Sequence, residues 1–213
     1  MDQPTLVLGL GNPLMGDDGA GLAALEALRR GYAFGPGVEL EDGGGLGLGL
    51  LPLVEDAAAL LVLDAVRFGG RPGTTVVREG DEIPRCLSLK LSPHQAGFRE
   101  TLALAGLRGN LPRRLALVGV EVAGAEYAEP LSPEVKSALP AMVAAAVARL
   151  ESWGCSVRPI ASAERGDERD QQTIPYQYQF PVGGGITPAL RRGTETVTTK
   201  DLNKEIKSKA KYL

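Results

Sequence analysis

Three side chains from separate stretches of the chain could together hold a metal ion: Asp18, Asp64 and His94. His94 is the only histidine, so the sequence excludes a site built on two or more histidines of this chain. Two carboxylates and one neutral imidazole form a small set of oxygen and nitrogen ligands with open positions. That set suits a divalent first-row transition metal better than a hard cation or a structural zinc ion. An open site of this kind binds a molecule that brings ligands of its own.

The first acid, Asp18, lies in the stretch TLVLGLGNPLMGDDGAG at 5–21. The apolar residues of this stretch indicate a buried strand, Gly9 and Gly11 permit a tight turn, and a helical pattern follows. Such a turn in an α/β sheet lies at the carboxyl edge, where ligand sites collect. An aspartate here could simply cap the helix. Because one aspartate is enough for capping, the adjacent pair Asp17 and Asp18 also suggests a binding site.

The second acid, Asp64, closes the apolar run ALLVLDAV at 59–66. A continuous run of this kind is typical of a strand buried on both faces of a parallel sheet. Burying a carboxylate is unfavourable, so we expect Asp64 to emerge at the carboxyl edge in an exposed position in a cleft. The alternative is an aspartate that caps a nearby turn.

His94 is predicted to lie in the first turn of a helix that covers LSPHQAGFRETLALAGL. Ser92 is a good N-cap and Pro93 suits the first helical position. The positive end of a helix disfavours imidazolium, so His94 should be neutral near pH 7 with a lone pair free for a metal or a proton. The alternative is an ordinary surface histidine.

The order of elements predicts a three-layer α/β/α sandwich with a mostly parallel twisted sheet, because strands and helices alternate through residue 154. Further strands are expected at 38–41, 73–79 and 115–122. A composition change after residue 154 divides the chain into a domain at 1–154 and an extension at 155–213. The extension is predicted to be linker-like or disordered, with a possible short helix at its end.

Composition narrows the functional classes. The net charge of −3 offers no broad basic surface for nucleic acid. No apolar run approaches the ~20 residues that a membrane helix requires, and the first residues lack a signal-peptide pattern. We therefore expect a cytoplasmic protein that binds neither nucleic acid nor a membrane; the sequence does not indicate its oligomeric state.

Five motifs in their order and spacing resemble the hydrogenase maturation endopeptidases, which trim the C-terminal extension of the large subunit of nickel-iron hydrogenases. The motifs are GLGNPLMGDDGAG at 9–21, DGG at 42–44, LVLDAV at 61–66, LSPHQAG at 91–97 and LVGVE at 117–121. The resemblance implies that Asp18, Asp64 and His94 bind metal and recognise nickel already inserted into the precursor. It also implies cleavage only after nickel insertion, with the nickel supplied by the substrate. No counterpart in the family is assigned to residues beyond about 156.

One hypothesis for the cleavage is that nickel, held by thiolates of the substrate, is bridged to Asp18, Asp64 and His94. The metal could polarise the scissile carbonyl or acidify a water. Asp17, or the glycine-rich turn of Gly43, Gly44 and Gly45, would then hold the peptide backbone.

Two other classes remain open. GLGNP also begins peptidyl-tRNA hydrolases, but these need a histidine shortly after that turn, where this chain has aspartates. A non-proteolytic accessory module that binds nickel or a nucleotide is the other class. A nucleotide is disfavoured because the third glycine of a dinucleotide motif is absent and Asp17 and Asp18 would repel a pyrophosphate.

Overall fold

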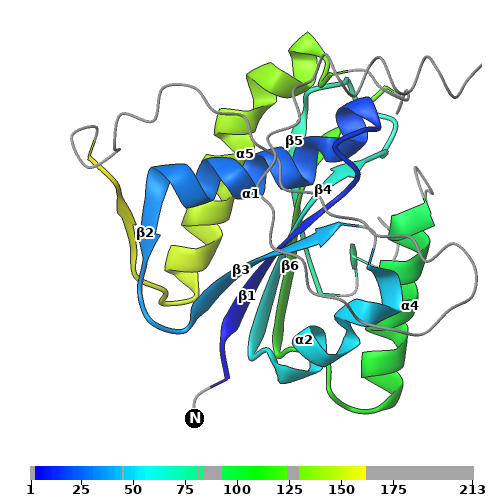
Figure 1. Cartoon of the computed structure of the whole chain (residues 1–213), viewed down its shortest axis with the longest axis vertical. Helices are drawn as coiled ribbons and strands as arrows, with labels where there is room; N and C mark the ends of the chain where they lie inside the picture. Colours follow the sequence, from blue (N-terminus) through cyan, green and yellow to red (C-terminus); the bar gives the residue numbers. More distant parts are fainter. Residues whose placement is uncertain (1–2, 45, 81, 84–92, 124–129, 162–213) are drawn as a thin grey trace, which may run out of the picture. The chain divides into compact units, whose positions relative to one another are not determined.

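The computed structural model describes residues 3–44, 46–80, 82–83, 93–123 and 130–161. Their centre is a five-stranded sheet of order β3-β1-β4-β6-β5 (Figure 1). The strands are β1 Thr5–Leu10, β3 Val38–Gly44, β4 Ala59–Val66, β5 Thr75–Glu79 and β6 Arg114–Glu121. β3, β1, β4 and β6 are parallel and β5 is antiparallel to β6, which confirms the predicted mostly parallel sheet.

Helices cover both faces of this sheet, as the three-layer prediction requires (Figure 1). One face packs against α1 and α5, and the other against α2 and α4. The helices are α1 Ala20–Gly31, α2 Leu51–Asp56, α4 Pro93–Leu107 and α5 Pro133–Ser152, with short 3-10 turns η1 Gly16–Gly19 and η2 Gly47–Leu50. No described helix is long and apolar enough to cross a membrane.

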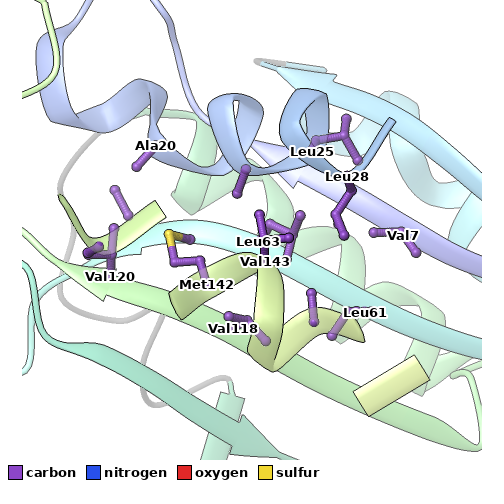
Figure 2. Close-up of a cluster of buried hydrophobic side chains, with 14 of the residues drawn as sticks. Val7, Ala20, Leu25, Leu28, Leu61, Leu63, Val118, Val120, Met142 and Val143 are labelled. Atoms are coloured by element: carbon purple, nitrogen blue, oxygen red, sulfur yellow. The ribbon is translucent and has the colours of Figure 1, made fainter. Parts of the chain in front are cut away.

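The central strand β4 is buried along its whole length because both of its faces contact helices. Residues Leu61 and Leu63 point toward α1 and α5, where Leu28 and Met142 belong to the same cluster (Figure 2). Leu60, Val62 and Val66 belong to the cluster on the opposite face, toward α2 and α4. The continuous apolar run at 59–66 therefore has the two-sided burial that the sequence predicted.

A second, two-stranded sheet pairs β2 Tyr32–Phe34 with β7 Val157–Pro159 in antiparallel register. β7 comes after the predicted domain end at residue 154, so residues just beyond that point still form secondary structure with β2 of the predicted domain. The extension predicted to be linker-like or disordered covers 155–213, and its residues 162–213, with the possible C-terminal helix, lie outside the described residues.

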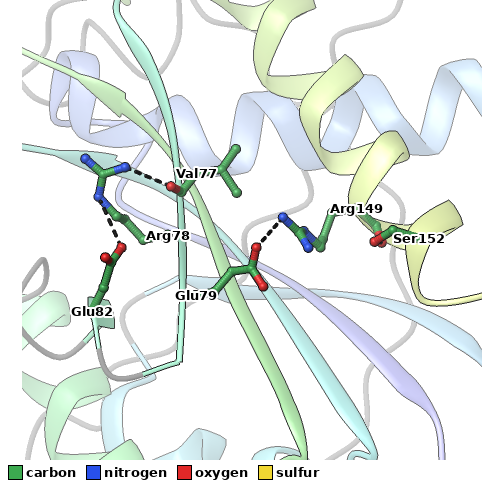
Figure 3. Close-up of polar contacts among 6 residues, drawn as sticks. All are labelled: Val77, Arg78, Glu79, Glu82, Arg149 and Ser152. Atoms are coloured by element: carbon green, nitrogen blue, oxygen red, sulfur yellow. Dashed lines mark hydrogen bonds and ion pairs between the residues drawn. The ribbon is translucent and has the colours of Figure 1, made fainter.

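At each edge strand of the large sheet, an arginine side chain donates a hydrogen bond to a backbone carbonyl that points away from the sheet. Backbone carbonyls point alternately to the two sides of a strand. Gly37 O accepts a hydrogen bond from Thr5 N and therefore points toward β1. Leu40 O, three residues later, therefore points away from the sheet. Arg29 Nη2 of α1 donates to Leu40 O at 2.6 Å. On β5, Arg78 Nη1 donates to the outward Val77 O at 2.9 Å (Figure 3).

Ion pairs also hold the β5 side of the sheet. Arg149 of α5 pairs with Glu79 of β5 at 2.5 Å, and Arg78 pairs with Glu82 at 3.6 Å (Figure 3). The Arg78 guanidinium also lies 5.2 Å from the centre of the Phe68 ring. These contacts keep the guanidinium of Arg78 at the sheet edge.

Removing an edge arginine should expose a strand edge that can pair with another chain. We expect Arg29→Ala and Arg78→Ala to increase concentration-dependent association, measured by light scattering during slow heating. Arg30→Ala is the matched control, because Arg30 pairs with exposed Glu26 one turn away and with no strand carbonyl among the residues that the structure describes. Equal association of all three variants and the unmodified protein would show that the arginines do not protect the edges.

Candidate functional site

The carboxyl edge of the sheet gathers the segments that carry the predicted site residues. η1 follows β1 and contacts both α1 and the neighbouring strand β4. The start of α1 is pressed against β4: a Cβ built on Gly21 would lie 2.2 Å from Leu63 O. Only glycine permits this approach, which places the turn carrying Asp18 beside the strand carrying Asp64.

Asp18 is fully buried within this turn. Its Oδ2 accepts a hydrogen bond from Asn12 N at 2.9 Å. Gly11 has φ +124°, and a Cβ there would lie 1.9 Å from Asp18 O, so glycine is required at this position too. The N-cap of α1 is Gly19, without a side-chain hydrogen bond, so the capping alternative for the two aspartates is wrong for this helix.

Asp17 contacts a distant part of the chain. Its Oδ1 accepts from Ser132 N at 2.6 Å, across 115 positions of sequence. Ser132 is the N-cap of α5, and its Oγ accepts from Val135 N at 3.3 Å. Asp17 thus fixes the start of α5 to the turn; its predicted contact with a substrate backbone stays a prediction.

Asp64 lies inside β4 and is fully buried, so the expected exposed position in a cleft is wrong. The strand continues to Val66, which keeps Asp64 within the sheet, and its Oδ1 accepts from Ala65 N at 2.8 Å. Because side chains alternate along a strand, Asp64 shares a face with Val62 and Val66 and points toward the layer of α2 and α4. α4 is the helix that carries His94.

His94 lies in the first turn of α4, which begins at Pro93 as predicted. Its side chain, with Ser92, lies outside the described residues, so the convergence of the imidazole with the two carboxylates stays a prediction. Among the described residues, no group of three or more His, Cys, Asp or Glu side chains is arranged to hold a metal. Asp18 and Asp64 nevertheless fit the predicted donor set, because both are buried carboxylates at one edge, Asp18 in the turn η1 and Asp64 in the strand β4 that this turn contacts.

A polar contact and a close backbone approach fix the beginning of α4 at this edge. Thr101 is fully buried, and its Oγ1 donates to Gly47 O at 2.9 Å and lies 3.0 Å from Gly97 O. A Cβ on Gly97 would lie 2.9 Å from Gly47 Cα, so two glycines are needed for α4 and η2 to pack this closely. Gly97 is one helical turn after His94, so this contact positions the turn that carries the histidine.

The glycine-rich segment after Asp42 was predicted to be a loop, but its first two glycines belong to a strand. Gly43 and Gly44 end β3, and a Cβ on Gly43 would lie 2.8 Å from Leu10 Cδ2 and 2.9 Å from Leu8 Cδ1. The absence of a side chain at Gly43 therefore has a packing reason within the sheet. Contact of Gly43 and Gly44 with a peptide stays a prediction, and Gly45 lies outside the described residues.

Glu121 is a buried glutamate at the carboxyl edge of the sheet. The sequence did not indicate a role for it. It ends β6 and its two carboxylate oxygens accept from Phe68 N at 2.7 Å and Gly69 N at 3.1 Å. It shapes the turn that follows β4, two residues beyond the Gly119 that pairs with Asp64. The signal that singled out Asp64, an acid at the end of a buried strand, applies equally to Glu121.

These features define an α/β protein with buried carboxylates at the carboxyl edge of a mostly parallel sheet. A family model described as hydrogenase maturation protease matches residues 22–149. The chain belongs to the hydrogenase maturation protease family and is an endopeptidase of that family.

Similar proteins agree in sequence and in structure. Hydrogenase expression/formation protein HupD of Rhizobium leguminosarum is 41% identical over 74% of this chain and 80% of its own length. The hydrogenase 2 maturation protease of Escherichia coli is 34% identical over 72% of this chain and 94% of its own length. The solved structure of the hydrogenase maturating endopeptidase HybD from E. coli matches 73% of this chain and 97% of its own, with a TM-score of 0.70 and 32% identity.

The contact made by Thr101 can be tested with near-isosteric substitutions. Thr101→Val keeps the shape and removes the hydroxyl, which leaves Gly47 O without this donor; such a loss destabilises by about 1–3 kcal/mol. We expect a lower melting temperature for Thr101→Val, measured by calorimetry, and recovery with Thr101→Ser. Equal stability of the valine variant would show that the hydroxyl does not hold α4 against η2.

Proposed function

We propose that this protein removes the C-terminal extension of the large-subunit precursor of a nickel-iron hydrogenase after nickel insertion, with Asp18, Asp64 and His94 binding the nickel of the substrate. The observation that carries the proposal is the pair of buried carboxylates, Asp18 and Asp64, held at one sheet edge in a chain of the hydrogenase maturation protease family. The names of the relatives, a hydrogenase 2 maturation protease and a hydrogenase maturating endopeptidase, support the substrate class.

The carboxylates suit this task because their surroundings are already arranged. Asp18 is held by Asn12 N and Asp64 by Ala65 N, so little reorganisation is needed when a cation binds. A buried carboxylate attracts a divalent cation more strongly than an exposed one, because water screens the charges less. His94 would add a nitrogen ligand from the first turn of α4, where the helix N-terminus favours the neutral imidazole.

The chemical step is hydrolysis of one peptide bond. The oxygen of a water molecule adds to the scissile carbonyl carbon, the C–N bond breaks, and the leaving amine takes a proton. The nickel of the substrate supplies Lewis acidity to the carbonyl or to the water. The residues of this chain bind that nickel and so fix the scissile bond beside it, which accounts for cleavage only after nickel insertion. Asp17 and the segment of Gly43, Gly44 and Gly45 are proposed to hold the peptide backbone.

The proposal places the protein in the cytoplasm with the precursor as its partner and with nickel supplied by that partner. A peptidyl-tRNA hydrolase is disfavoured by the family match and because aspartates, not a histidine, follow shortly after GLGNP. A non-proteolytic accessory module is disfavoured because the family is one of proteases.

The decisive experiment incubates the protein with nickel-loaded and nickel-free precursor and weighs the products by mass spectrometry. We expect release of the C-terminal peptide from the nickel-loaded precursor alone. Asp18→Asn, Asp64→Asn and His94→Ala should each lower the cleavage rate by about 100-fold or more, because each loses a ligand of the nickel. The asparagine variants keep a hydrogen-bond acceptor and remove the charge.

Asp56→Asn is the matched control, since Asp56 is an exposed aspartate at the end of α2. It should cleave at the unmodified rate, and circular dichroism should show that all variants are folded. Full activity in two of the three site variants, or equal cleavage of nickel-free precursor, would contradict the proposal.

A further inference from the structure

A hollow of about 280 Å³ opens beside the turn that carries Asp18. It is lined by residues of the turn, of α1 and of the segment before α5: Pro13, Gly16, Gly19, Leu22, Ala23 and Leu131. Leu22 and Ala23 are half-buried, whereas Ala24 and Leu25 face the sheet, so the hollow lies on the outer side of α1. Gly16 and Gly19 are the two ends of η1 and enclose Asp17 and Asp18.

The floor of the hollow has no side chains at Gly16 and Gly19, because the backbone of the turn requires glycine at these positions. A Cβ on Gly19 would lie 2.9 Å from Pro13 Cα, and Gly16 has φ +54°. A side chain from either position is therefore excluded or strained. The space is a consequence of how the turn folds around Asp18.

Two hydrogen bonds hold the floor and the wall of the hollow relative to each other. Asp18 Oδ2 accepts from Asn12 N, which closes the turn that forms the floor. Asp17 Oδ1 accepts from Ser132 N, directly after Leu131, which forms the wall. The hollow is thus already formed by the same two aspartates that mark the candidate site.

The chemistry of the lining selects the kind of ligand. None of the six lining residues carries a charge or a polar side-chain group. Pockets for whole small molecules begin at about 300 Å³, so this volume suits one large side chain. Leu14 in the same loop is 60% exposed and extends the apolar surface. A peptide segment that passes the turn could therefore insert an apolar side chain here.

We infer that this hollow is a specificity pocket that binds an apolar side chain of the precursor segment next to the cleaved bond. The inference rests on the proposed function for its substrate. Continuity with the candidate site supports this occupant, since floor and candidate metal ligand belong to one four-residue turn. A side chain bound in the hollow therefore sets the position of the peptide relative to Asp18.

The test fills the hollow and measures precursor binding and cleavage separately. Ala23→Leu places a larger side chain in the space from the outer side of α1. Ala141→Leu is the matched control: Ala141 is an exposed alanine of α5 that lines a different hollow of about 520 Å³ with Pro72 and Pro133. We expect Ala23→Leu to raise the Kd and the KM for nickel-loaded precursor about tenfold or more. Ala141→Leu should stay within about twofold of the unmodified protein.

A substrate variant completes the experiment. Trimming the apolar residues that flank the cleaved bond to alanine should raise KM for the unmodified protein and reduce the difference between it and Ala23→Leu. If Ala23→Leu fails to fold, Ala23→Ser adds a polar group without filling the space and should raise KM several-fold. These changes act on KM, whereas loss of a nickel ligand acts on the cleavage rate.

Each outcome decides the inference. Unchanged Kd and KM in folded Ala23→Leu would overturn the pocket while leaving the proposed function intact. Large destabilisation of the free protein by Ala23→Leu, with the KM of the serine variant unchanged, would show that residues of this chain fill the hollow. Precursor that binds without being cleaved would contradict the proposed function alone, since the Kd values would still test the pocket. Precursor that does not bind the unmodified protein would overturn both.

Discussion

Close backbone contact at Gly11 and Gly21 is the constraint on which the candidate site depends. A Cβ on Gly11 would overlap Asp18 O, and one on Gly21 would overlap Leu63 O. These two contacts fold the segment after β1 back over the sheet edge and press the start of α1 against β4. Without them, Asp18 could not be buried beside the strand that carries Asp64. The glycines therefore position the acids, although they contribute no ligand themselves.

Burial of both carboxylates opposes folding unless their oxygens are hydrogen-bonded. The chain supplies backbone N–H groups for this purpose: Asn12 N for Asp18, Ala65 N for Asp64 and Ser132 N for Asp17. Glu121 follows the same rule with Phe68 N and Gly69 N. The carboxyl edge is thus a dense set of acids held by backbone donors. Such an arrangement keeps the acids in place before any cation arrives, which is what a preorganised binding site requires.

The sequence predicted the layers and the location of Asp18 and Asp64 near the carboxyl edge of the sheet because those features have local signals. The apolar run at 59–66 and the glycine turn before Asp18 can be interpreted without knowledge of distant residues. The structure departs from the sequence where contacts join remote segments. Asp17 bonds to a residue 115 positions away, and Thr101 bonds to one 54 positions away. The burial of Asp64 was missed for a related reason, because β4 continues two residues past it and its backbone neighbour Ala65 provides the hydrogen bond.

The turn η1 contacts both α1 and β4, and this position has a consequence for recognition. Asp64 points toward the layer of α2 and α4, whereas the hollow beside Ala23 lies outside α1 on the opposite side. Asp18 and the floor of the hollow belong to the one turn between them. In the proposed function, nickel bound on one side and an apolar side chain bound on the other would both fix the same peptide through that turn. A precursor without nickel would keep only the second contact, and one small apolar contact is too weak to hold a peptide bond in place for hydrolysis.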